Sequence, residues 1–202
     1  PRLGALIFVL VAVYVFIQNA WSAQQTLIEE RGFENAIMQA SVNEDEATGL
    51  LNRRGLDIAV TGWISRRRPF GVMLISLDAK PVTPSDDESP ADASTPSWPD
   101  VTKTAQLIAS RIPSSDSLGR WSDTEFLVVS RVTDPRAFTI AANGVRSFIE
   151  EQNKKDNLGT VSIGLSLFPL FEPFETTLSR AEQAVREARE AGANCVRSYW
   201  SS

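Results

Sequence analysis

The sequence contains no histidine and only one cysteine, Cys195, among its 202 residues. The lack of histidine removes the commonest metal ligand and the commonest general base. A single cysteine cannot form an internal disulfide. Because no histidine could activate it, we interpret Cys195 as a packed side chain near a strand rather than as a nucleophile. An excess of basic residues is also lacking: the net charge is -5, which argues against broad nucleic-acid binding.

Charged side chains are absent between Arg2 and Glu29, and the chain is apolar from Leu3 to Ile17. With the residues up to position 23 included, this stretch reaches the about 20 residues that cross a lipid bilayer. Residues 1–23 are therefore predicted to form a transmembrane helix, with Trp21 at the membrane interface. A cleaved signal peptide and a buried core helix are the two alternatives.

Residues 24–44 are rich in helix formers and predict a linker helix. Its apolar positions show spacings of three, four and seven, but Gly32 interrupts them. The segment could pair with a second copy of the chain to form a homodimer. It could equally pack on its own domain.

A structural motif begins at Asp45 and reads Asp-Glu-Ala-Thr-Gly-Leu-Leu-Asn-Arg-Arg. Thr48 and Gly49 form a turn, and Leu50 is an apolar side chain placed to enter the core. A helix should begin at the last three residues and run to about Ser65. The motif residues that we single out are Asp45, Thr48, Gly49, Leu50, Asn52, Arg53 and Arg54.

A second motif, Arg-Trp-Ser-Asp-Thr-Glu-Phe, begins at Arg120 and leads directly into the apolar run Leu127 to Val129. A polar turn that enters a β-branched strand is typical of a hairpin that holds side chains at the edge of a sheet. The turn residues are Ser122, Asp123, Thr124, Glu125 and Phe126.

The two motifs resemble those of the GGDEF domain, the diguanylate cyclase family. The first matches the family's opening pattern, Asp-x-Leu-Thr-Gly-Leu-x-Asn-Arg-Arg, at every defined position except Ala47. The second stands in the place of the signature turn. The resemblance implies an α/β fold for residues 45–202, with a central mixed sheet flanked by helices and a palm-like arrangement.

The signature turn departs from the family at its catalytic positions. Its two glycines, which let guanine nucleotide approach the backbone, are replaced by Ser122 and Asp123. The place of an acidic metal ligand is taken by Thr124, and a neutral hydroxyl cannot replace a carboxylate on a hard divalent ion. Only Glu125 and Phe126 keep the family's identities. The second metal-binding carboxylate should end the apolar strand that starts at Phe70, and that place is taken by Ser76.

Three charged residues are vestigial candidates for nucleotide binding. Asp78 lies two residues after Ser76 and could form a displaced metal site with Glu125, whereas Arg189 replaces the family's lysine near the last helix and could meet a phosphate. No residue is predicted to be catalytic, and we expect neither a bound metal nor a cofactor.

Two further ligand positions of the family are altered. Residues 81–100 form an acidic, proline-rich insert that should be largely disordered, and Trp98 stands where a guanine-reading Asp is expected, unless a register shift makes Asp100 available. Pro113 replaces the arginine of the product-inhibition motif, although Asp116 remains.

These observations predict a catalytically inactive, membrane-anchored GGDEF-like protein of bacterial signalling. It would act through protein contacts, as a regulatory or accessory subunit of a membrane complex, with its head in the cytoplasm at the inner membrane. A receptor that binds GTP or cyclic di-GMP without turnover is the alternative. Residual diguanylate cyclase activity is a third possibility.

Overall fold

The computed structural model describes residues 42–79, 100–156 and 159–200. The predicted transmembrane helix, all of the predicted linker helix except its last three residues, and the acidic insert except Asp100 lie outside these ranges. Within the described ranges, no helix has both the length and the apolar character needed to cross a membrane.

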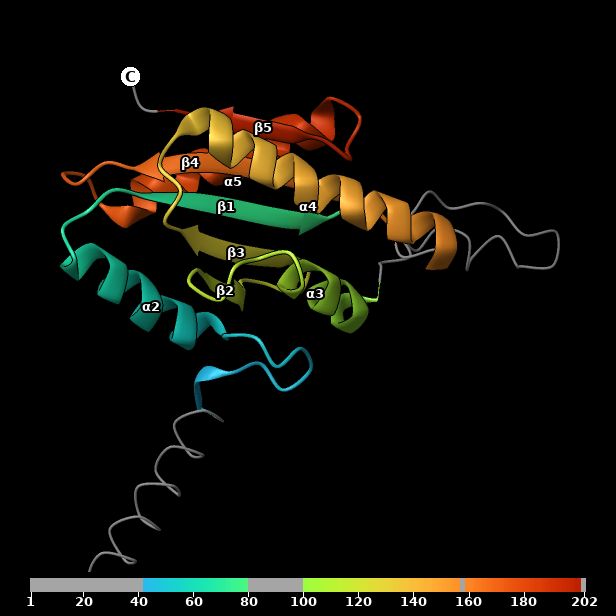
Figure 1. Ribbon diagram of the computed structural model, residues 1–202, viewed down its shortest axis with the longest axis horizontal. Coiled ribbons are helices and arrows are strands. Elements are labelled where there is room, and N and C mark those ends of the chain that lie inside the picture. Colours follow the sequence, from blue (N-terminus) through green and yellow to red (C-terminus); the bar gives the residue numbers. More distant parts are fainter. Residues whose placement is uncertain (1–41, 80–99, 157–158, 201–202) are drawn as a thin grey trace, which may run out of the picture. The chain divides into compact units, whose positions relative to one another are not determined.

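A five-stranded sheet forms the centre of the globular unit, in the order β2-β3-β1-β4-β5. All neighbouring strands are antiparallel except β4 and β5, which are parallel, so the sheet is mixed as predicted. Figure 1 shows the long strand β1 at its middle. The strands are β1 (Phe70–Leu77), β2 (Ser117–Arg120), β3 (Glu125–Ser130), β4 (Val161–Phe168) and β5 (Val196–Tyr199).

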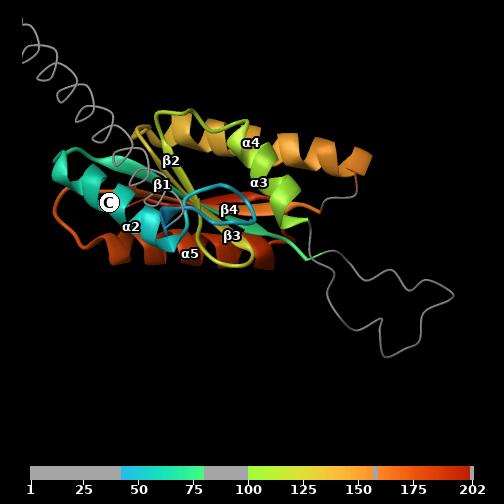
Figure 2. The ribbon, with the colours of Figure 1, turned by 90° about the horizontal axis from the view of Figure 1, so that it is seen from below.

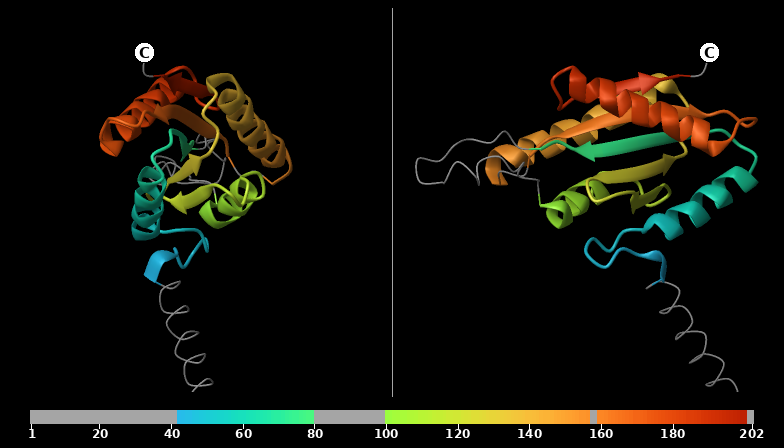
Figure 3. Two further views of the ribbon diagram at one scale, coloured as in Figure 1. Left: turned by 60° about the vertical axis from the view of Figure 1, so that its left-hand side comes forward. Right: turned by 180° about the vertical axis from the view of Figure 1, so that it is seen from behind.

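Helices cover both faces of this sheet. Seen from below and along the sheet, α3 and α4 lie on one face, and α2 and α5 lie on the other (Figures 2 and 3). Their bounds are α2 (Arg53–Ser65), α3 (Val101–Ala109), α4 (Pro135–Asp156) and α5 (Phe174–Glu190). The described unit therefore has the predicted three-layer α/β architecture.

The alternation of side chains along β1 divides the core in two. Met73, Ile75 and Leu77 pack with α3 and α4, whereas Val72 and Leu74 pack with α2 and α5. Every residue of β1 is buried, as expected for a central strand that helices cover on both faces. Ser76 belongs to the second series and is fully buried. Its hydroxyl therefore faces the layer that contains α5.

The predicted elements agree with the structure except at some ends. The apolar spacing from Val101 to Ile112 predicts a helix over these residues, but α3 ends at Ala109. The sequence also predicts a helix from about Arg136 to Glu151, whereas α4 runs from Pro135 to Asp156. Asn52 caps α2, since its side chain accepts a hydrogen bond of 2.9 Å from the Gly55 backbone N–H.

Gly164 lets α5 approach the sheet closely. A Cβ atom at this position of β4 would lie 2.1 Å from the Ala181 carbonyl oxygen and 2.8 Å from Val185 Cγ2. Its neighbours on the same face, Ser162 and Ser166, are also small. A glycine inside a strand usually marks a close backbone approach, and the structure shows such an approach here.

We predict that G164A destabilises the protein by about 2–3 kcal/mol, since the added methyl group cannot be accommodated without moving α5. Urea unfolding of the full chain, kept in mild detergent and followed by circular dichroism, measures the change. G144A is the matched control: Gly144 is exposed in α4 with open space around it, so this substitution should stabilise by about 0.5–1 kcal/mol. Equal stability of G164A and the unmodified protein would contradict the tight packing.

Candidate functional site

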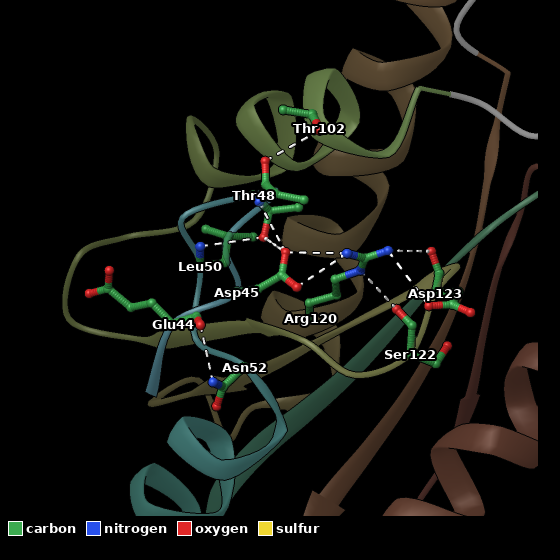
Figure 4. Close-up of polar contacts among 10 residues, drawn as sticks. Glu44, Asp45, Thr48, Leu50, Asn52, Thr102, Arg120, Ser122 and Asp123 are labelled. Atoms are coloured by element: carbon green, nitrogen blue, oxygen red, sulfur yellow. Dashed lines mark hydrogen bonds and ion pairs between the residues drawn. The ribbon is translucent and has the colours of Figure 1, made fainter. Parts of the chain in front are cut away.

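The opening motif and the hairpin are joined by an ion pair. Arg120 Nη1 donates hydrogen bonds to both carboxylate oxygens of Asp45, at 3.3 and 3.2 Å (Figure 4). The same side chain also contacts the turn, because its Nε donates to the Ser122 carbonyl at 3.3 Å. Asp45 also accepts two hydrogen bonds from Thr48, at 3.0 Å from its backbone N–H and at 2.7 Å from its hydroxyl. Arg120 thus connects two segments that are 75 residues apart.

The surroundings of Asp45 favour its ionised form. Burial alone would raise the pKa of this carboxyl, but hydrogen bonds from Thr48 and the positive charge and hydrogen bonds of Arg120 together lower it below 3.8. A lowered folded-state pKa adds stability that is present above the unfolded value and is lost as the pH falls through the folded value. The ion pair therefore stabilises the hairpin at neutral pH.

Two further contacts fix the hairpin on the opening motif. The guanidinium of Arg53 lies over the ring of Trp121, 3.3 Å from its centroid, in a cation–π contact. The backbone N–H of Arg120 donates to the Leu51 carbonyl at 2.7 Å. Gly119 permits this approach, because a Cβ there would lie 2.5 Å from the Leu51 carbonyl oxygen.

The turn carries Ser122 and Asp123 in place of the family's two glycines, and the hydroxyl of Thr124 in place of its carboxylate. Ser122 and Asp123 are exposed, and the Asp123 side chain projects fully into solvent. Ser122 Oγ donates to Glu125 Oε2 at 3.0 Å, and the Thr124 carbonyl accepts from the Leu77 backbone N–H at 2.8 Å. The predicted positions of the motif residues in a hairpin between β2 and β3 are confirmed.

Ser76 lies opposite Glu125 in the pairing of β1 with β3. Its hydroxyl is 3.5 Å from Glu125 Oε1 and accepts a hydrogen bond from Arg189 Nη2. The same nitrogen of Arg189 donates to the Leu77 carbonyl at 3.0 Å. The structure therefore brings together Ser76, Glu125 and Arg189 at one end of β1.

Asp78 has a separate set of partners. Its carboxylate accepts hydrogen bonds from Ser162 Oγ at 2.7 Å, from Thr160 Oγ1 at 2.8 Å and from the Asn194 backbone N–H at 3.0 Å. Only 6% of the residue is exposed. Asp78 thus fastens the segment after α5 to the sheet, whereas the displaced metal site of Asp78 with Glu125 stays a prediction.

The donor set of this region does not fit the divalent cation that the family implies. Ser76 and Thr124 offer hydroxyls where carboxylates are needed, and Ser76 Oγ already accepts from a cation. Among the described residues, no three or more His, Cys, Asp or Glu side chains are grouped closely enough to hold a metal ion.

The structure describes part of the two altered ligand positions, the guanine-reading position at Trp98 or Asp100 and the product-inhibition motif at Pro113 and Asp116. Asp100 caps α3, accepting from the Lys103 backbone N–H at 3.0 Å, whereas Trp98 lies outside the described residues. A hollow of about 290 Å³ lies beside Pro113 and Asp116, and no basic residue is found among those that line it. Arg111 instead places its guanidinium over the Phe148 ring, 3.7 Å from the centroid.

Comparisons with known proteins agree with this architecture. Residues 101–195 match the family model described as "Diguanylate cyclase, GGDEF domain". The chain is 26% identical over 196 residues to Diguanylate cyclase DosC of Escherichia coli, a match that covers 92% of this chain and 41% of DosC. The chain thus spans about two fifths of the length of this curated relative.

Solved structures share the fold. The diguanylate cyclase SiaD of Pseudomonas aeruginosa, solved with its activator SiaC, aligns with a TM-score of 0.68 at 20% identity, covering 93% of this chain and 73% of SiaD. The coiled coil and GGDEF domain of DgcB from Caulobacter crescentus, in complex with c-di-GMP, align with a TM-score of 0.71 at 14% identity. The alignment covers 91% of this chain and 99% of the DgcB chain. The S helix-GGDEF-EAL structure of Vibrio cholerae LapD, bound to c-di-GMP, aligns with a TM-score of 0.66 at 17% identity. The alignment covers 86% of this chain and 40% of the LapD chain.

Sequence reasoning located the candidate residues but missed several of their partners. The Asp45 pair with Arg120 could have been suspected from opposite charges in two motifs. The hydroxyls of Thr160 and Ser162 share a strand face, but nothing in the sequence indicated that Asp78 would be their acceptor. The contact of Arg189 with Ser76 had no sequence signal, since the two residues are 113 positions apart.

We predict that D45N destabilises the protein at pH 7 by about 1 kcal/mol, because the amide keeps the shape but loses the charge that pairs with Arg120. The difference should shrink as the pH falls and disappear below the lowered pKa of the folded Asp45, where the unmodified carboxyl is protonated as well. Urea unfolding at several pH values measures both effects. D123N is the control and should cause little change, because the 3.7 Å ion pair of Asp123 with Arg120 involves a fully exposed carboxylate that solvent screens. A pH-independent effect of D45N would exclude the ion pair as its cause.

Proposed function

We propose that the chain, whose residues 101–195 match the GGDEF domain model, is a catalytically inactive member of that family that acts by binding other proteins. It serves as a regulatory or accessory subunit of a membrane complex. Residues 1–23 anchor it in the inner membrane, with the GGDEF domain facing the cytoplasm. The proposal joins the family's fold to the altered chemistry of this chain's own pocket.

One observation carries the proposal: hydroxyls, those of Ser76 and Thr124, stand at the positions where two-metal phosphoryl chemistry needs carboxylates. Such chemistry depends on metal ions that neutralise charge on the attacking and leaving oxygens. Ser76 and Thr124 supply no negative charge, and the Ser76 hydroxyl is bonded to Arg189. Glu125 keeps the family's carboxylate and is hydrogen-bonded to Ser122, whereas the carboxylate of Asp123 stands in a glycine position and projects into solvent.

The conserved architecture supports a role in binding. The hairpin is held on the opening motif by the Asp45–Arg120 pair and the Arg53–Trp121 contact, so its exposed turn keeps a defined shape. SiaD was solved in complex with an activator protein, which shows that the same fold can engage a protein partner. A rigid turn without catalytic groups is a suitable surface for such contacts.

The receptor alternative depends on Arg189 and Glu125, since c-di-GMP is bound in the DgcB and LapD structures. In this chain both side chains already have partners within the protein, and a nucleotide would have to displace them. We therefore place protein binding first.

We predict that the full chain in mild detergent forms no cyclic di-GMP from GTP and Mg²⁺, because the metal-binding carboxylates are replaced. Chromatographic analysis of the reaction, with an active diguanylate cyclase as the positive control, measures this. Product formed at a rate comparable to the control would overturn the proposed loss of activity. In calorimetric titrations, binding of GTP or cyclic di-GMP tighter than about 10 µM, a free energy near -7 kcal/mol, would instead favour the receptor.

We further predict that the chain, purified in mild detergent from its own membranes, elutes with a specific second protein. Mass spectrometry of the eluted complex identifies this partner. A variant whose exposed turn is altered, S122R/D123R, should lose the partner if the turn makes the contact, whereas R186M, on the exposed side of α5, should keep it. Repeated isolation of the unmodified chain as a lone monomer would contradict the proposal.

A further inference from the structure

The loop between β4 and α5 carries an aromatic side chain that has no place in the core. Phe171 is 97% exposed, and its neighbour Leu170 is 38% exposed. Both ends of the loop are held by aromatic packing: the Phe168 ring stacks on Phe70 with 4.5 Å between centroids, and the Phe174 ring lies 6.3 Å from Phe70. The exposure of Phe171 therefore belongs to a loop with fixed ends, and an exposed apolar side chain of this size calls for a partner.

Three consecutive arginines lie at the same end of the sheet. Arg66, Arg67 and Arg68 connect α2 to β1, and all three are exposed. Phe70 at the start of β1 pairs with Phe168 at the end of β4, so the α2–β1 loop and the β4–α5 loop leave the sheet together, as Figures 1 and 3 show. Within the described ranges, no ion pair engages these three guanidiniums.

The acidic side chains nearby do not cancel this charge. Glu172 is paired within the protein, because Arg180 Nη1 and Nη2 donate to its two carboxylate oxygens at 2.5 and 2.7 Å. Glu175, in the first turn of α5, is exposed. Arg66 lies over the Trp63 ring, 5.1 Å from its centroid, which leaves Arg67 and Arg68 as the guanidiniums most available to a partner.

We propose that Arg66, Arg67, Arg68, Leu170 and Phe171, here called the basic tip, form a docking surface for a lipid bilayer that contains anionic lipids. An exposed phenylalanine on a loop enters the boundary between headgroups and acyl chains, where its ring leaves water. Guanidiniums beside it pair with the phosphates of the headgroups, and each one adds to the attraction toward a negative surface. The bilayer is the partner that meets both halves of the basic tip at once.

Docking through the basic tip leaves the hairpin turn free. β1 begins at Phe70, beside the tip, and ends at Leu77, whose backbone N–H donates to the Thr124 carbonyl at 2.8 Å. The tip and the turn therefore lie at opposite ends of the sheet. This inference shares with the proposed function only the location at a membrane, and it depends neither on lost catalysis nor on a protein partner.

The test places a spin label beside Phe171 in the full chain, reconstituted into vesicles of phosphatidylcholine alone or mixed with phosphatidylglycerol. The labelled variant is L170C/C195S, in which serine keeps the hydrogen-bond donor of Cys195. Electron paramagnetic resonance then compares the access of oxygen and of a water-soluble nickel complex, present on both sides of the bilayer. We expect the label at position 170 to lose contact with the nickel complex only when phosphatidylglycerol is present. A label in D123C/C195S, at the other end of the sheet, should stay in contact with it in both.

Charge and apolar variants separate the two halves of the basic tip. R67Q/R68Q should lower the ratio of docked to undocked label at position 170 at least about tenfold, and F171S should lower it as well. R54Q/R186Q is the matched control: it removes the same charge from exposed positions elsewhere on α2 and α5 and should leave the ratio nearly unchanged. All replaced side chains are exposed, and thermal unfolding checks that the variants fold.

Equal effects of R67Q/R68Q and R54Q/R186Q would overturn the proposal, as would docking that does not need phosphatidylglycerol. A label that stays in water in every vesicle would also overturn it and would assign the basic tip to an acidic protein partner instead. None of these outcomes bears on the proposed function, which cyclase assays and copurification test separately.

Discussion

The close contact of α5 with β4 at Gly164 is the constraint on which the rest of the site depends. A helix can lie this close to a sheet only where the strand face carries small side chains, and β4 supplies Ser162, Gly164 and Ser166 there. The depth of α5 then decides what its last turn can reach. Because Ala181, Ala184 and Ala188 are fully buried, Arg189 comes within hydrogen-bond distance of β1. Packing in the core thus sets the electrostatics of the pocket.

Two polar networks share the end of the sheet without competing. Asp78 is satisfied by two hydroxyls and one backbone N–H, which compensates for burying a carboxylate and fixes the segment after α5. Arg189 is satisfied by Ser76 and the Leu77 carbonyl. If these two groups paired with each other, the segment after the helix would lose its anchor. In the structure, Asp78 and Glu125 therefore have separate sets of hydrogen-bond partners.

The fold and the candidate residues were largely predictable because they rest on local patterns. The opening motif predicted a turn and a helix, and the structure shows the turn at Thr48–Gly49 and α2 beginning at Arg53. The apolar run of β1 predicted a central strand, which is buried throughout. Helix ends were less predictable, as at α3, which ends at Ala109 although the apolar spacing continues to Ile112. The partners of Arg189 and Asp78 were not predictable, since they depend on how deeply α5 packs and on which loop follows it.

The loss of the metal-binding carboxylates has a consequence for stability as well as for chemistry. A cluster of buried carboxylates repels itself unless a cation is present, so a metal-binding pocket stores a cost that only the ion removes. Hydroxyls at positions 76 and 124 remove this cost, and Arg189 satisfies the buried hydroxyl of Ser76 without any ligand. The buried hydroxyl of Ser76 thus finds its hydrogen-bond partner within the protein itself.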